Sequence, residues 1–529
     1  MKTTRFFSIF LMACSVASYS QDLEWEKSYG GQHSDYLFDA VATPDYGFIL
    51  AGSSLSGKTG TKTDANRGDL DYWIWKMDEH GQLDWQRSFG GSGMDLLQSI
   101  LLTADGGYLL GGTSYSDKGG DKKDASLGNG DYWIIKLDAK GNEQWQRTLG
   151  GSGQEQLQSI LLTADGGYLL GGSSSSDPGK DIPYGKKDKN YGDMDYWLVR
   201  LDKDGKEVWQ RTYGGTYSDM LRAMTTTPDG GYLIGGYSNS PESGNKSEQQ
   251  YGLGDYWVLK LDKDGKEEWQ KVYGSEGDDH LYAITPVRDG HYILAGNTTG
   301  GAMGNKTAGN RNGTDFWLVK IDISGSMVWD KTYDVGKQDI LSSLLENADG
   351  TLVIGGHAQS ETFGTRKKDK EDINDYVLLK LDESGDELWR RGIGSNDEDI
   401  VKKVIELRDG GYLLAGSSKG EPSRDRKSGR GRNDFWVVKL KDKQKPTKDK
   451  VVIEAVPNPT AQFTNVLVGY DYDKGTARVF DLAGRQLQEF EVTDRMIPVD
   501  LGGLPQGIYL IEIKTNLQTD AVKVIKKKE

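Results

Sequence analysis

The chain has 529 residues, a hydrophobic content of 36%, a charged content of 27% and a formal net charge of -15 at pH 7. This negative charge argues against nucleic acid as a partner, because binding to a phosphate backbone requires a basic surface. The 71 glycines and 14 tryptophans indicate short strands, tight turns and large aromatic packing residues rather than disorder. The composition therefore favours an all-β protein.

Residues 1–20 have the pattern of a cleavable export signal. Lys2 and Arg5 precede the apolar run FFSIFLMA, and Ser18 and Ser20 occupy the -3 and -1 positions of a cleavage site. The apolar run is too short to span a bilayer, and no later stretch approaches the roughly 20 apolar residues that a transmembrane helix needs. We therefore expect an exported chain without a transmembrane segment, whose net charge after loss of two cations is -15 - 2 = -17.

Cys14 is the only cysteine and lies within this segment. An exported mature chain would therefore carry neither a disulfide nor a free thiol. The sequence LMAC around Cys14 also resembles a lipoprotein signal, although Met12 is unusual in such a signal. Lipidation thus stays open as an alternative, while the segment SVASYS suits ordinary cleavage before Gln21 better.

The stretch 131–172, DYWIIKLDAKGNEQWQRTLGGSGQEQLQSILLTADGGYLLGG, recurs in variants along most of the chain. Its apolar runs have strand length, and AKGNE and TADGG have the chemistry of turns, so one unit predicts four short strands. A second marker, Asp-aromatic-Trp, keeps the same phase and is broken only by Val377. Steps of 60, 60, 64, 60, 60 and 60 residues separate the tryptophans that mark seven units, namely Trp25, Trp85, Trp145, Trp209, Trp269, Trp329 and Trp389.

Four-stranded repeats must stack on their neighbours, as in a β-propeller or a β-solenoid, because one unit cannot bury its own faces. An unpaired strand around Trp25 precedes the first complete unit, and the last unit, which contains Asp434, lacks its fourth strand. If the N-terminal strand completes the last unit, the array has no exposed sheet edge. We therefore predict a seven-bladed β-propeller over residues 22–440 that is closed by its N-terminal strand.

Strand order assigns the connections of each unit to two faces. One face carries tight turns, and the other carries long loops that differ between units in charge and aromatic content. Variable loops on a rigid scaffold commonly carry binding sites. A tryptophan that recurs at one register is interpreted as a packing residue between blades. Aromatic residues confined to single loops are our candidates for a ligand platform: Tyr115, Tyr184 and Tyr191.

An acidic residue follows each marker tryptophan by ten positions: Asp35, Asp95, Glu155, Asp219, Asp279, Asp339 and Asp399. In a closed propeller these side chains would form a ring at one mouth of the central channel, on the long-loop face. Each carboxylate could cap backbone N–H groups of its own Gly-rich turn. Alternatively the ring could hold a cation such as Ca²⁺, which prefers several oxygen ligands. No other cofactor is evident, and Glu155 would distort a symmetric ion site.

The sequence contains no recognisable catalytic motif. The five histidines lack a metal-binding spacing, no G-x-S-x-G elbow accompanies His357, and the Gly-rich segments lack the lysine of a P-loop. Galactose-oxidase-like chemistry would require a cysteine in the mature chain. We therefore name no catalytic residue.

The composition changes after Leu440. Residues 441–450, KDKQKPTKDK, have the charge and proline content of a linker. Residues 451–529 contain no tryptophan and no copy of the repeat. They predict a small β-sandwich with six strands: VVIEAV, NVLVGY, TARVFDL, QLQEFEV, IYLIEIK and AVKVIKK.

Four motifs follow one another in this domain: Pro457-Asn458-Pro459, VFDLAGR from Val479, LPQGIYLIEI from Leu504, and a terminal motif from Lys523 to Lys526. In this order they resemble the C-terminal sorting domain of type IX secretion substrates in Bacteroidetes-type bacteria. The resemblance implies recognition of residues 451–529 by the type IX machinery, followed by surface attachment or release. The repeats resemble, more loosely, delta-60 and Kelch-like propeller repeats, a functionally mixed group that implies a fold and no chemistry.

Two functions from different classes remain. The first is a secreted or cell-surface propeller that binds an extracellular protein or polysaccharide through its long-loop face. The second is a secreted carbohydrate-active enzyme, a hydrolase or lyase, that uses paired carboxylates on that face. We favour binding, because catalysis needs two unequal carboxyl groups and the near-identical repeats offer equivalent ones.

Overall fold

A computed structural model describes six segments of the chain: residues 21–179, 183–311, 313–359, 373–442, 452–470 and 472–527. The predicted signal segment 1–20 and the linker residues 443–450 lie outside the described residues. Every regular element in the described segments is a β-strand, and none is a helix. The prediction of an all-β protein is therefore confirmed.

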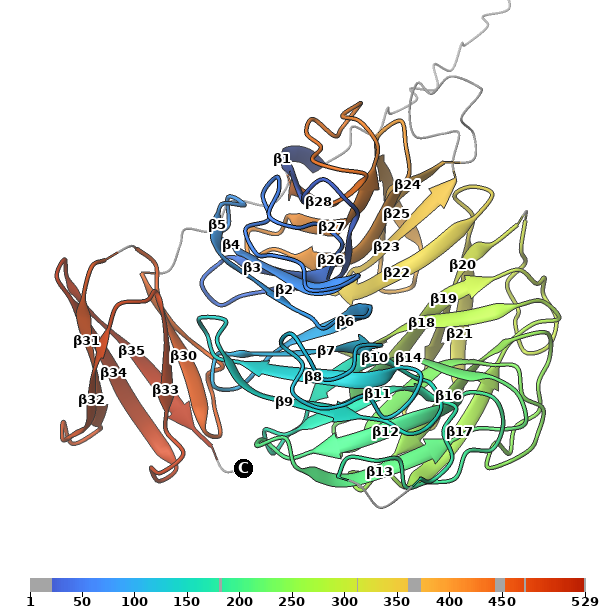
Figure 1. The fold of residues 1–529 in the computed structure, drawn as a ribbon, viewed down its shortest axis with the longest axis horizontal. Coiled ribbons are helices and arrows are strands. Elements are labelled where there is room, and N and C mark those ends of the chain that lie inside the picture. The colour runs from blue at the N-terminus through green and yellow to red at the C-terminus, as the bar shows by residue number, and fades with distance from the viewer. Residues whose placement is uncertain are drawn as a thin grey trace, which may run out of the picture.

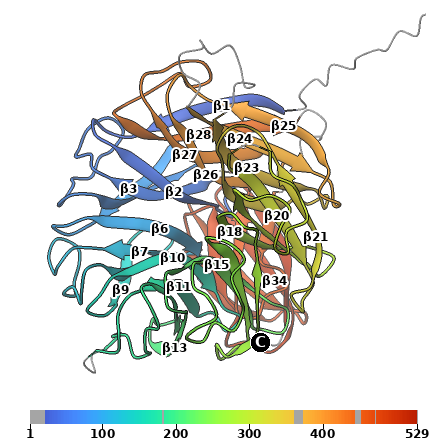
Figure 2. The same ribbon diagram turned by 90° about the vertical axis from the view of Figure 1, so that its right-hand side faces the viewer.

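The described part of residues 21–442 forms seven four-stranded antiparallel sheets (Figures 1 and 2). Sheets 1 to 6 each contain four strands that are consecutive in the chain, whereas sheet 7 combines three strands from the end of this region with one from its start. The strands of sheets 1 to 3 are β2 (Asp35–Ala42), β3 (Phe48–Ser54), β4 (Asp71–Met77) and β5 (Leu83–Phe89); β6 (Asp95–Leu102), β7 (Tyr108–Ser114), β8 (Asp131–Leu137) and β9 (Glu143–Leu149); β10 (Glu155–Leu162), β11 (Tyr168–Ser174), β12 (Asp195–Leu201) and β13 (Glu207–Tyr213).

The remaining sheets continue in the same order. Their strands are, for sheet 4, β14 (Asp219–Thr226), β15 (Tyr232–Ser238), β16 (Asp255–Leu261) and β17 (Glu267–Tyr273); for sheet 5, β18 (Asp279–Pro286), β19 (Tyr292–Thr298), β20 (Asp315–Ile321) and β21 (Met327–Tyr333); for sheet 6, β22 (Asp339–Glu346), β23 (Leu352–Gln359), β24 (Asn374–Leu381) and β25 (Glu387–Ile393); for sheet 7, β26 (Asp399–Glu406), β27 (Tyr412–Lys419), β28 (Asn433–Asp442) and β1 (Gln21–Tyr29).

The second and third strands of each sheet form the core of this region. In sheet 2, for example, β7 (YLLGGTS) and β8 (DYWIIKL) contain only buried residues. Such continuous apolar runs are expected for strands that are covered on both faces. In contrast, four of the seven residues of β9 (EQWQRTL) are exposed or partly exposed, because this strand lies at the outer edge of the sheet. Neighbouring sheets thus cover one another along their central strands.

One aromatic contact recurs between neighbouring sheets. The ring of Tyr72 in sheet 1 packs on Trp133 of sheet 2, with ring centroids 4.9 Å apart. The Tyr72 hydroxyl also donates a hydrogen bond of 3.1 Å to the Trp133 carbonyl. At the boundary between sheets 5 and 6, Val377 replaces the tryptophan and shares a core cluster with Phe316. The same pair recurs as Tyr132–Trp197, Tyr196–Trp257, Tyr256–Trp317 and Tyr376–Trp436.

The first and last sheets also contact each other. Trp73 of sheet 1 packs on Phe435 of sheet 7, with ring centroids 4.6 Å apart. Each first strand contacts the first strand of the next sheet, from β2 through β26, and β26 contacts β2 in turn. The sheets therefore follow one another around a common centre in the order of the chain (Figure 2).

Strand β1 supplies the outer strand of sheet 7. It pairs antiparallel with β28, and Glu26 accepts a hydrogen bond of 2.8 Å from the Trp436 indole. Gln86 makes the equivalent bond to Trp73 in sheet 1. The ring of Tyr29 lies 4.5 Å from that of Trp75, so β1 also contacts sheet 1. The N-terminal strand therefore makes the contacts that fourth strands make in the other sheets.

Residues 452–527 form a separate β-domain around its own apolar core. The structure contains one strand more than the six predicted, MIPVD at Met496–Asp500, which Pro498 makes difficult to recognise as a strand. Its sheets are β29 (Ile453–Val456), β30 (Phe463–Val468) and β33 (Met496–Asp500), and β31 (Gly475–Asp481), β32 (Gln486–Val492), β34 (Gly507–Thr515) and β35 (Thr519–Lys526).

The first and last motifs of this domain lie side by side. The Asn458 side chain accepts the Ile525 N–H at 2.9 Å and donates to the Lys523 carbonyl at 2.7 Å. The Lys526 ammonium donates hydrogen bonds to the carbonyls of Leu501, Gly502 and Leu504. Motifs that are distant in the sequence thus form one hydrogen-bonded unit.

The small domain contacts the tight-turn face of the sheets (Figure 1). Lys140, in the turn between β8 and β9, lies 3.3 Å from Asp494, and Arg408, in the turn between β26 and β27, lies 2.7 Å from Glu454. The long loops lie on the opposite face, because they leave the other ends of the strands. The described contacts between the two domains therefore do not involve the long-loop face.

Deleting Asp22–Gly31 is expected to lower the melting temperature far more than ending the chain after Leu440. The deletion removes the outer strand of sheet 7, the indole acceptor Glu26 and the buried ring of Tyr29, and it exposes the edge of β28. Loss of one buried aromatic side chain alone typically costs about 3–5 kcal/mol. Thermal unfolding followed by circular dichroism compares the two variants, and equal melting of the N-terminal deletion and the parent chain would contradict the role of β1.

Candidate functional site

Each of the seven predicted ring residues begins the first strand of a sheet and is fully buried. Asp35 accepts the Gly31 N–H at 2.8 Å and the hydroxyl of Ser56 at 3.1 Å. In every sheet the carboxylate accepts the backbone N–H of the residue four positions earlier, at 2.5–2.8 Å. These bonds are those of the turn-capping hypothesis, and ion binding by the whole ring stays a prediction.

A second buried carboxylate faces most of these ring residues from the preceding sheet. It is the aspartate of the Asp-aromatic-Trp motif, which the sequence analysis uses only as a marker of phase. Asp71, for example, caps the Arg67 N–H at 2.7 Å and lies close enough to Asp95 to raise its own pKa further. A side chain at Gly90 would collide with the Asp71 carboxylate. The sheet boundaries therefore hold carboxylate pairs with a glycine beside them.

Burial raises the pKa values of these carboxyl groups. The pKa of Asp195 and of Asp255 rises to about 7, first because of desolvation and then because Asp219 and Asp279 lie nearby. The backbone N–H groups that these carboxylates accept act in the opposite direction. The two negative charges of each pair therefore repel each other, and a bound proton or cation would reduce this repulsion.

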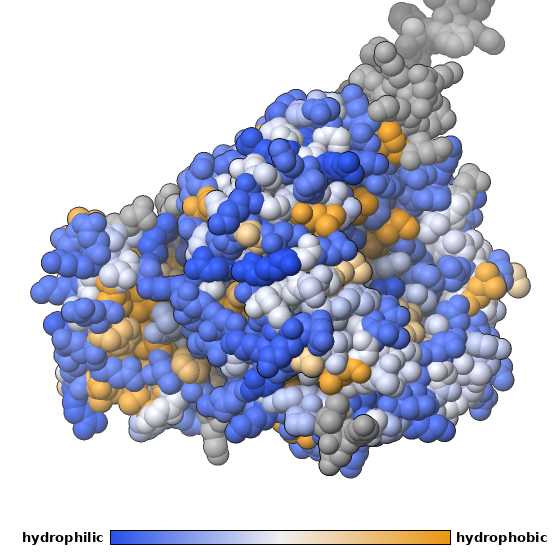
Figure 3. All heavy atoms as spheres, in the orientation of Figure 1, coloured by the Kyte–Doolittle hydropathy of each residue, from blue (hydrophilic) through white to orange (hydrophobic). Residues whose placement is uncertain are grey.

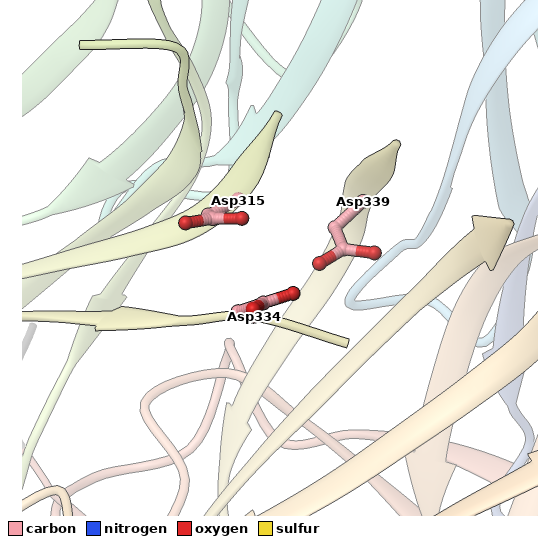
Figure 4. Close-up of side chains that lie close together, drawn as sticks. All are labelled: Asp315, Asp334 and Asp339. Carbon is pink, nitrogen blue, oxygen red and sulfur yellow. The ribbon is translucent and has the colours of Figure 1, made fainter. Parts of the chain in front are cut away.

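One boundary differs from the others. Asp334 occupies the position that is glycine at the six other sheet boundaries, such as Gly90 and Gly150. Its carboxylate joins Asp315 and Asp339, and one oxygen of each residue lies within 4.8 Å of the others. Figure 4 shows the three side chains converging from β20, the end of β21 and the start of β22. The boundary between sheets 5 and 6 thus carries three carboxylates.

The three candidate tyrosines lie in the long loops of two neighbouring sheets, Tyr115 between β7 and β8, and Tyr184 and Tyr191 between β11 and β12, and their use as a ligand platform stays a prediction. The Tyr115 hydroxyl accepts a hydrogen bond from Gln154, and the Tyr184 ring packs on the Arg147 guanidinium at 5.5 Å. Only Tyr191 belongs to the exposed large side chains of the described residues. A set of exposed apolar side chains in neighbouring long-face loops was not predicted from the sequence, namely Tyr217, Tyr251, Leu253 and Met303.

A pocket of about 350 Å³ opens on the long-loop face between sheets 7 and 1. We call it the mouth pocket. Lys402 projects from β26 into this pocket, with its ammonium 5.8 Å from the ring centroid of Phe38. The mouth pocket combines three cations with two aromatic rings and a single carboxylate, and its lining residues include Tyr36, Phe38, Glu398, Lys402, Lys419 and Arg432.

Arg222, on β14, adds a fourth cation near Lys402. Desolvation and the Arg222 charge both lower the pKa of Lys402. The Arg222 guanidinium lies 5.5 Å from the ring of Tyr237 and 5.9 Å from that of Tyr282, and its Nε is buried without a hydrogen-bond acceptor. Among the described residues, neither cation has a carboxylate within ion-pair distance. The centre of the sheets therefore holds uncompensated positive charge.

The family model of the secretion system C-terminal sorting domain matches residues 455–527. The chain therefore ends in a type IX sorting domain, which marks proteins that are secreted or attached to the cell surface. The predicted localisation is confirmed, and the type IX machinery is a partner of this domain. Within the described residues there is no helix that could cross a membrane.

Other comparisons find distant similarity. Regulatory protein FlaEY of Caulobacter vibrioides is 23% identical over 201 residues, which are 36% of this chain and 20% of FlaEY. The chain thus spans about a fifth of that relative. A fungal AA5-family alcohol oxidase in complex with copper has a TM-score of 0.44 and 11% identity over 96% of this chain and 100% of its own. Sqt1 from Chaetomium thermophilum has a TM-score of 0.40 and 10% identity over 79% and 100%.

The sorting domain exposes more apolar surface than the sheets do in the view of Figure 3. Leu482 is 76% exposed and Leu517 is 64% exposed, and Leu482 belongs to the VFDLAGR motif. Exposed apolar patches commonly mark sites of protein interaction.

Stability is expected to fall as the pH rises from about 4 to about 7. Because Asp195 and Asp255 have folded pKa values of about 7, above the roughly 3.9 of an unfolded aspartate, the folded state binds more protons than the unfolded chain between these values. The double variant Asp195→Asn and Asp255→Asn should lose part of this slope. Urea unfolding at several pH values measures it, and identical slopes for variant and parent would contradict the raised pKa values.

A chain that ends at Lys450 is expected to fold and to accumulate in the periplasm. It lacks the sorting domain, while β1 and the other strands of the seven sheets remain complete. Fractionation with an antibody against the sheets measures its distribution, and protease resistance controls for folding. Normal amounts of the truncated chain at the cell surface would show that residues 451–529 are not the sorting signal.

Proposed function

We propose that the seven sheets are the blades of a β-propeller closed by β1, and that this propeller binds acidic polysaccharide at its long-loop face. The contact of β26 with β2 and the pairing of β1 with β28 support the closure. The sorting domain places the protein outside the cell, where polysaccharides are available as ligands. The observation that carries the binding proposal is the cationic mouth pocket.

The charges of the mouth pocket favour an anionic ligand. The chain as a whole is acidic, with a net charge of -15, so its surface repels polyanions on average. Against this background, Lys402 and Arg222 form a local positive site that lacks a protein counter-ion among the described residues. A uronate or sulfate group would supply the missing negative charge and form charge-assisted hydrogen bonds.

The aromatic residues favour a sugar over a protein partner. Tyr36 and Phe38 line the mouth pocket, and flat aromatic faces pack well on pyranose rings. A pocket of about 350 Å³ suits one or two sugar units, since small-ligand sites span about 300–1,000 Å³. A stable protein interface would require roughly 800 Å² on each partner. Tyr191, Tyr217 and Tyr251 offer additional exposed rings along the same face.

The enzymatic alternative rests on the carboxylate pairs with raised pKa values. A glycosidase needs such unequal carboxyl groups. However, members of these pairs such as Asp195 and Asp219 are fully buried within their turns. They have no exposed surface to contact a polymeric substrate, so the geometry favours binding over hydrolysis.

Replacing Lys402 or Arg222 by alanine is expected to weaken binding of a uronate- or sulfate-bearing glycan at least about tenfold. A lost charge-assisted hydrogen bond is worth about 1.5–3 kcal/mol, and 1.4 kcal/mol is tenfold in affinity. The melting temperature should not fall, because each variant removes a poorly compensated cation. A glycan array identifies the ligand, titration calorimetry measures the affinity, and a hydrolase screen tests for turnover.

Lys263→Ala is the matched control, since Lys263 pairs with Asp264 on the tight-turn face. It removes the same charge and should leave binding unchanged. Equal loss in the control would indicate a non-specific charge effect. Binding of neutral glycans alone, or cleavage of any glycan on the screen, would overturn the proposal.

A further inference from the structure

The boundary between sheets 5 and 6 gathers more negative charge than its local structure needs. At the other boundaries two carboxylates cap two turns, and a glycine lies beside them. Here Asp315 and Asp339 still cap the N–H groups of Arg311 and Val335, at 3.2 Å and 2.7 Å. Asp334 adds a third carboxylate that caps no described turn.

Two buried oxygens of this cluster lack donors, as do the corresponding oxygens at the boundaries between sheets 3 and 4 and between sheets 4 and 5, so the added carboxylate of Asp334 is what distinguishes this boundary. Asp315 and Asp339 are both 0% exposed, and in each residue Oδ1 is buried without a hydrogen-bond partner. A buried carboxylate oxygen without a donor is costly, because it loses its hydration. Both side chains point into the space between the three residues (Figure 4). The unpaired oxygens therefore face a position that a ligand could occupy.

Nearby cations do not neutralise the cluster. Among the described residues, none of the three carboxylates has a lysine or arginine within ion-pair distance. Arg390 acts on Asp334 and Asp339 only at longer range, because its guanidinium binds Glu387 and the Asp334 carbonyl. Lys306, which faces Asp315 from the same sheet, donates to the Ala308 carbonyl. The cluster thus retains negative charge.

We propose that Asp315, Asp334 and Asp339 bind a Ca²⁺ ion that joins sheet 5 to sheet 6. Ca²⁺ takes oxygen ligands at about 2.3–2.6 Å, so two oxygens that share the ion lie at most about 5 Å apart. The three carboxylates meet this condition, since their oxygens lie within 4.8 Å of one another. Mg²⁺ requires oxygens at about 2.0–2.1 Å and near-ideal octahedral geometry, which strands held by pairing would not readily provide.

The proposal differs from ion binding by the whole ring of first-strand carboxylates. It requires Asp334, which is unique to this boundary, and it requires neither Asp95 nor Asp279. Asp334 is partly exposed, so an ion could enter from solvent beside it. Such an ion would compensate the missing aromatic pair at this boundary, where Val377 stands in place of the tryptophan.

Titration calorimetry of chelator-treated protein without residues 1–20 tests the site, with CaCl₂ as the probe. We expect one Ca²⁺ per chain, with Kd at or below about 10⁻³ M, as in extracellular calcium modules, and a rise of several degrees in melting temperature. Asp334→Gly restores the glycine of the other boundaries, should fold, and should lose both effects. Mg²⁺ should bind at least tenfold more weakly.

Two matched variants complete the experiment. Asp264→Asn removes an exposed carboxylate on the tight-turn face and should bind Ca²⁺ normally, as should Asp95→Asn combined with Asp279→Asn. Absence of Ca²⁺ binding by the parent chain, equal binding by Asp334→Gly, or equal affinity for Mg²⁺ would overturn the proposal. Loss of binding in the Asp95 and Asp279 variant would also overturn it, in favour of the ring. None of these outcomes depends on glycan binding.

Discussion

The packing of an aromatic strand against the next sheet is the constraint on which the structure depends. No single four-stranded sheet can bury both of its faces, so each must pack one face on the sheet before it and the other face on the sheet after it. The Tyr–Trp pair does this with one large contact and one hydrogen bond to a backbone carbonyl, as in Tyr72 and Trp133. Because the pair occupies one register of the third strand, it also fixes the position of the aspartate that begins that strand.

The buried carboxylates follow from this arrangement. Each boundary must connect an outer strand to the innermost strand of the next sheet through a short Gly-rich turn, whose N–H groups need acceptors. The aspartate that begins the first strand accepts an N–H of this turn, as Asp95 does from Gly91, whereas the aspartate of the preceding sheet accepts an N–H of its own long loop, as Asp71 does from Arg67. Their proximity is tolerated because these N–H groups stabilise the charged form while burial disfavours it. Identical turns generate identical pairs, so the repeat by itself creates no unique site.

Function is therefore expected where the repeat is broken. Asp334 replaces a glycine in one turn, and Lys402 and Arg222 replace uncharged residues at inward-facing positions of two first strands. The last sheet is assembled from both ends of the repeat region, and the mouth pocket lies beside it, between sheets 7 and 1. Such departures cost stability in a packed repeat, and a bound ligand would offset that cost.

The period of the tryptophans was sufficient to predict the strand order, the outer position of β1 and the turn location of residues such as Asp35. Periodicity could not reveal the mouth pocket, because Phe38 and Lys402 are 364 positions apart and meet only when the first and last sheets come together. Periodicity also gave no sign that Asp71 pairs with the carboxylate of the next sheet, because an aspartate that recurs in every copy marks only the position of the repeat. The loop tyrosines were predicted as a ligand platform from the aromatic content of single loops. In the structure the ring of Tyr184 packs on the Arg147 guanidinium.

In the proposed function, the two domains divide the surface of the protein between secretion and binding. The sorting domain contacts the tight-turn face through Asp494 and Glu454, which pair with Lys140 and Arg408 of the sheets, and it directs the chain to the type IX machinery. The opposite face carries the long loops, the mouth pocket and the carboxylate cluster of Asp334. Positive and negative sites on one face lie at different sheet boundaries, so each retains its own charge. An acidic protein can therefore attract an anionic polymer at one boundary and a cation at another without the two sites neutralising each other.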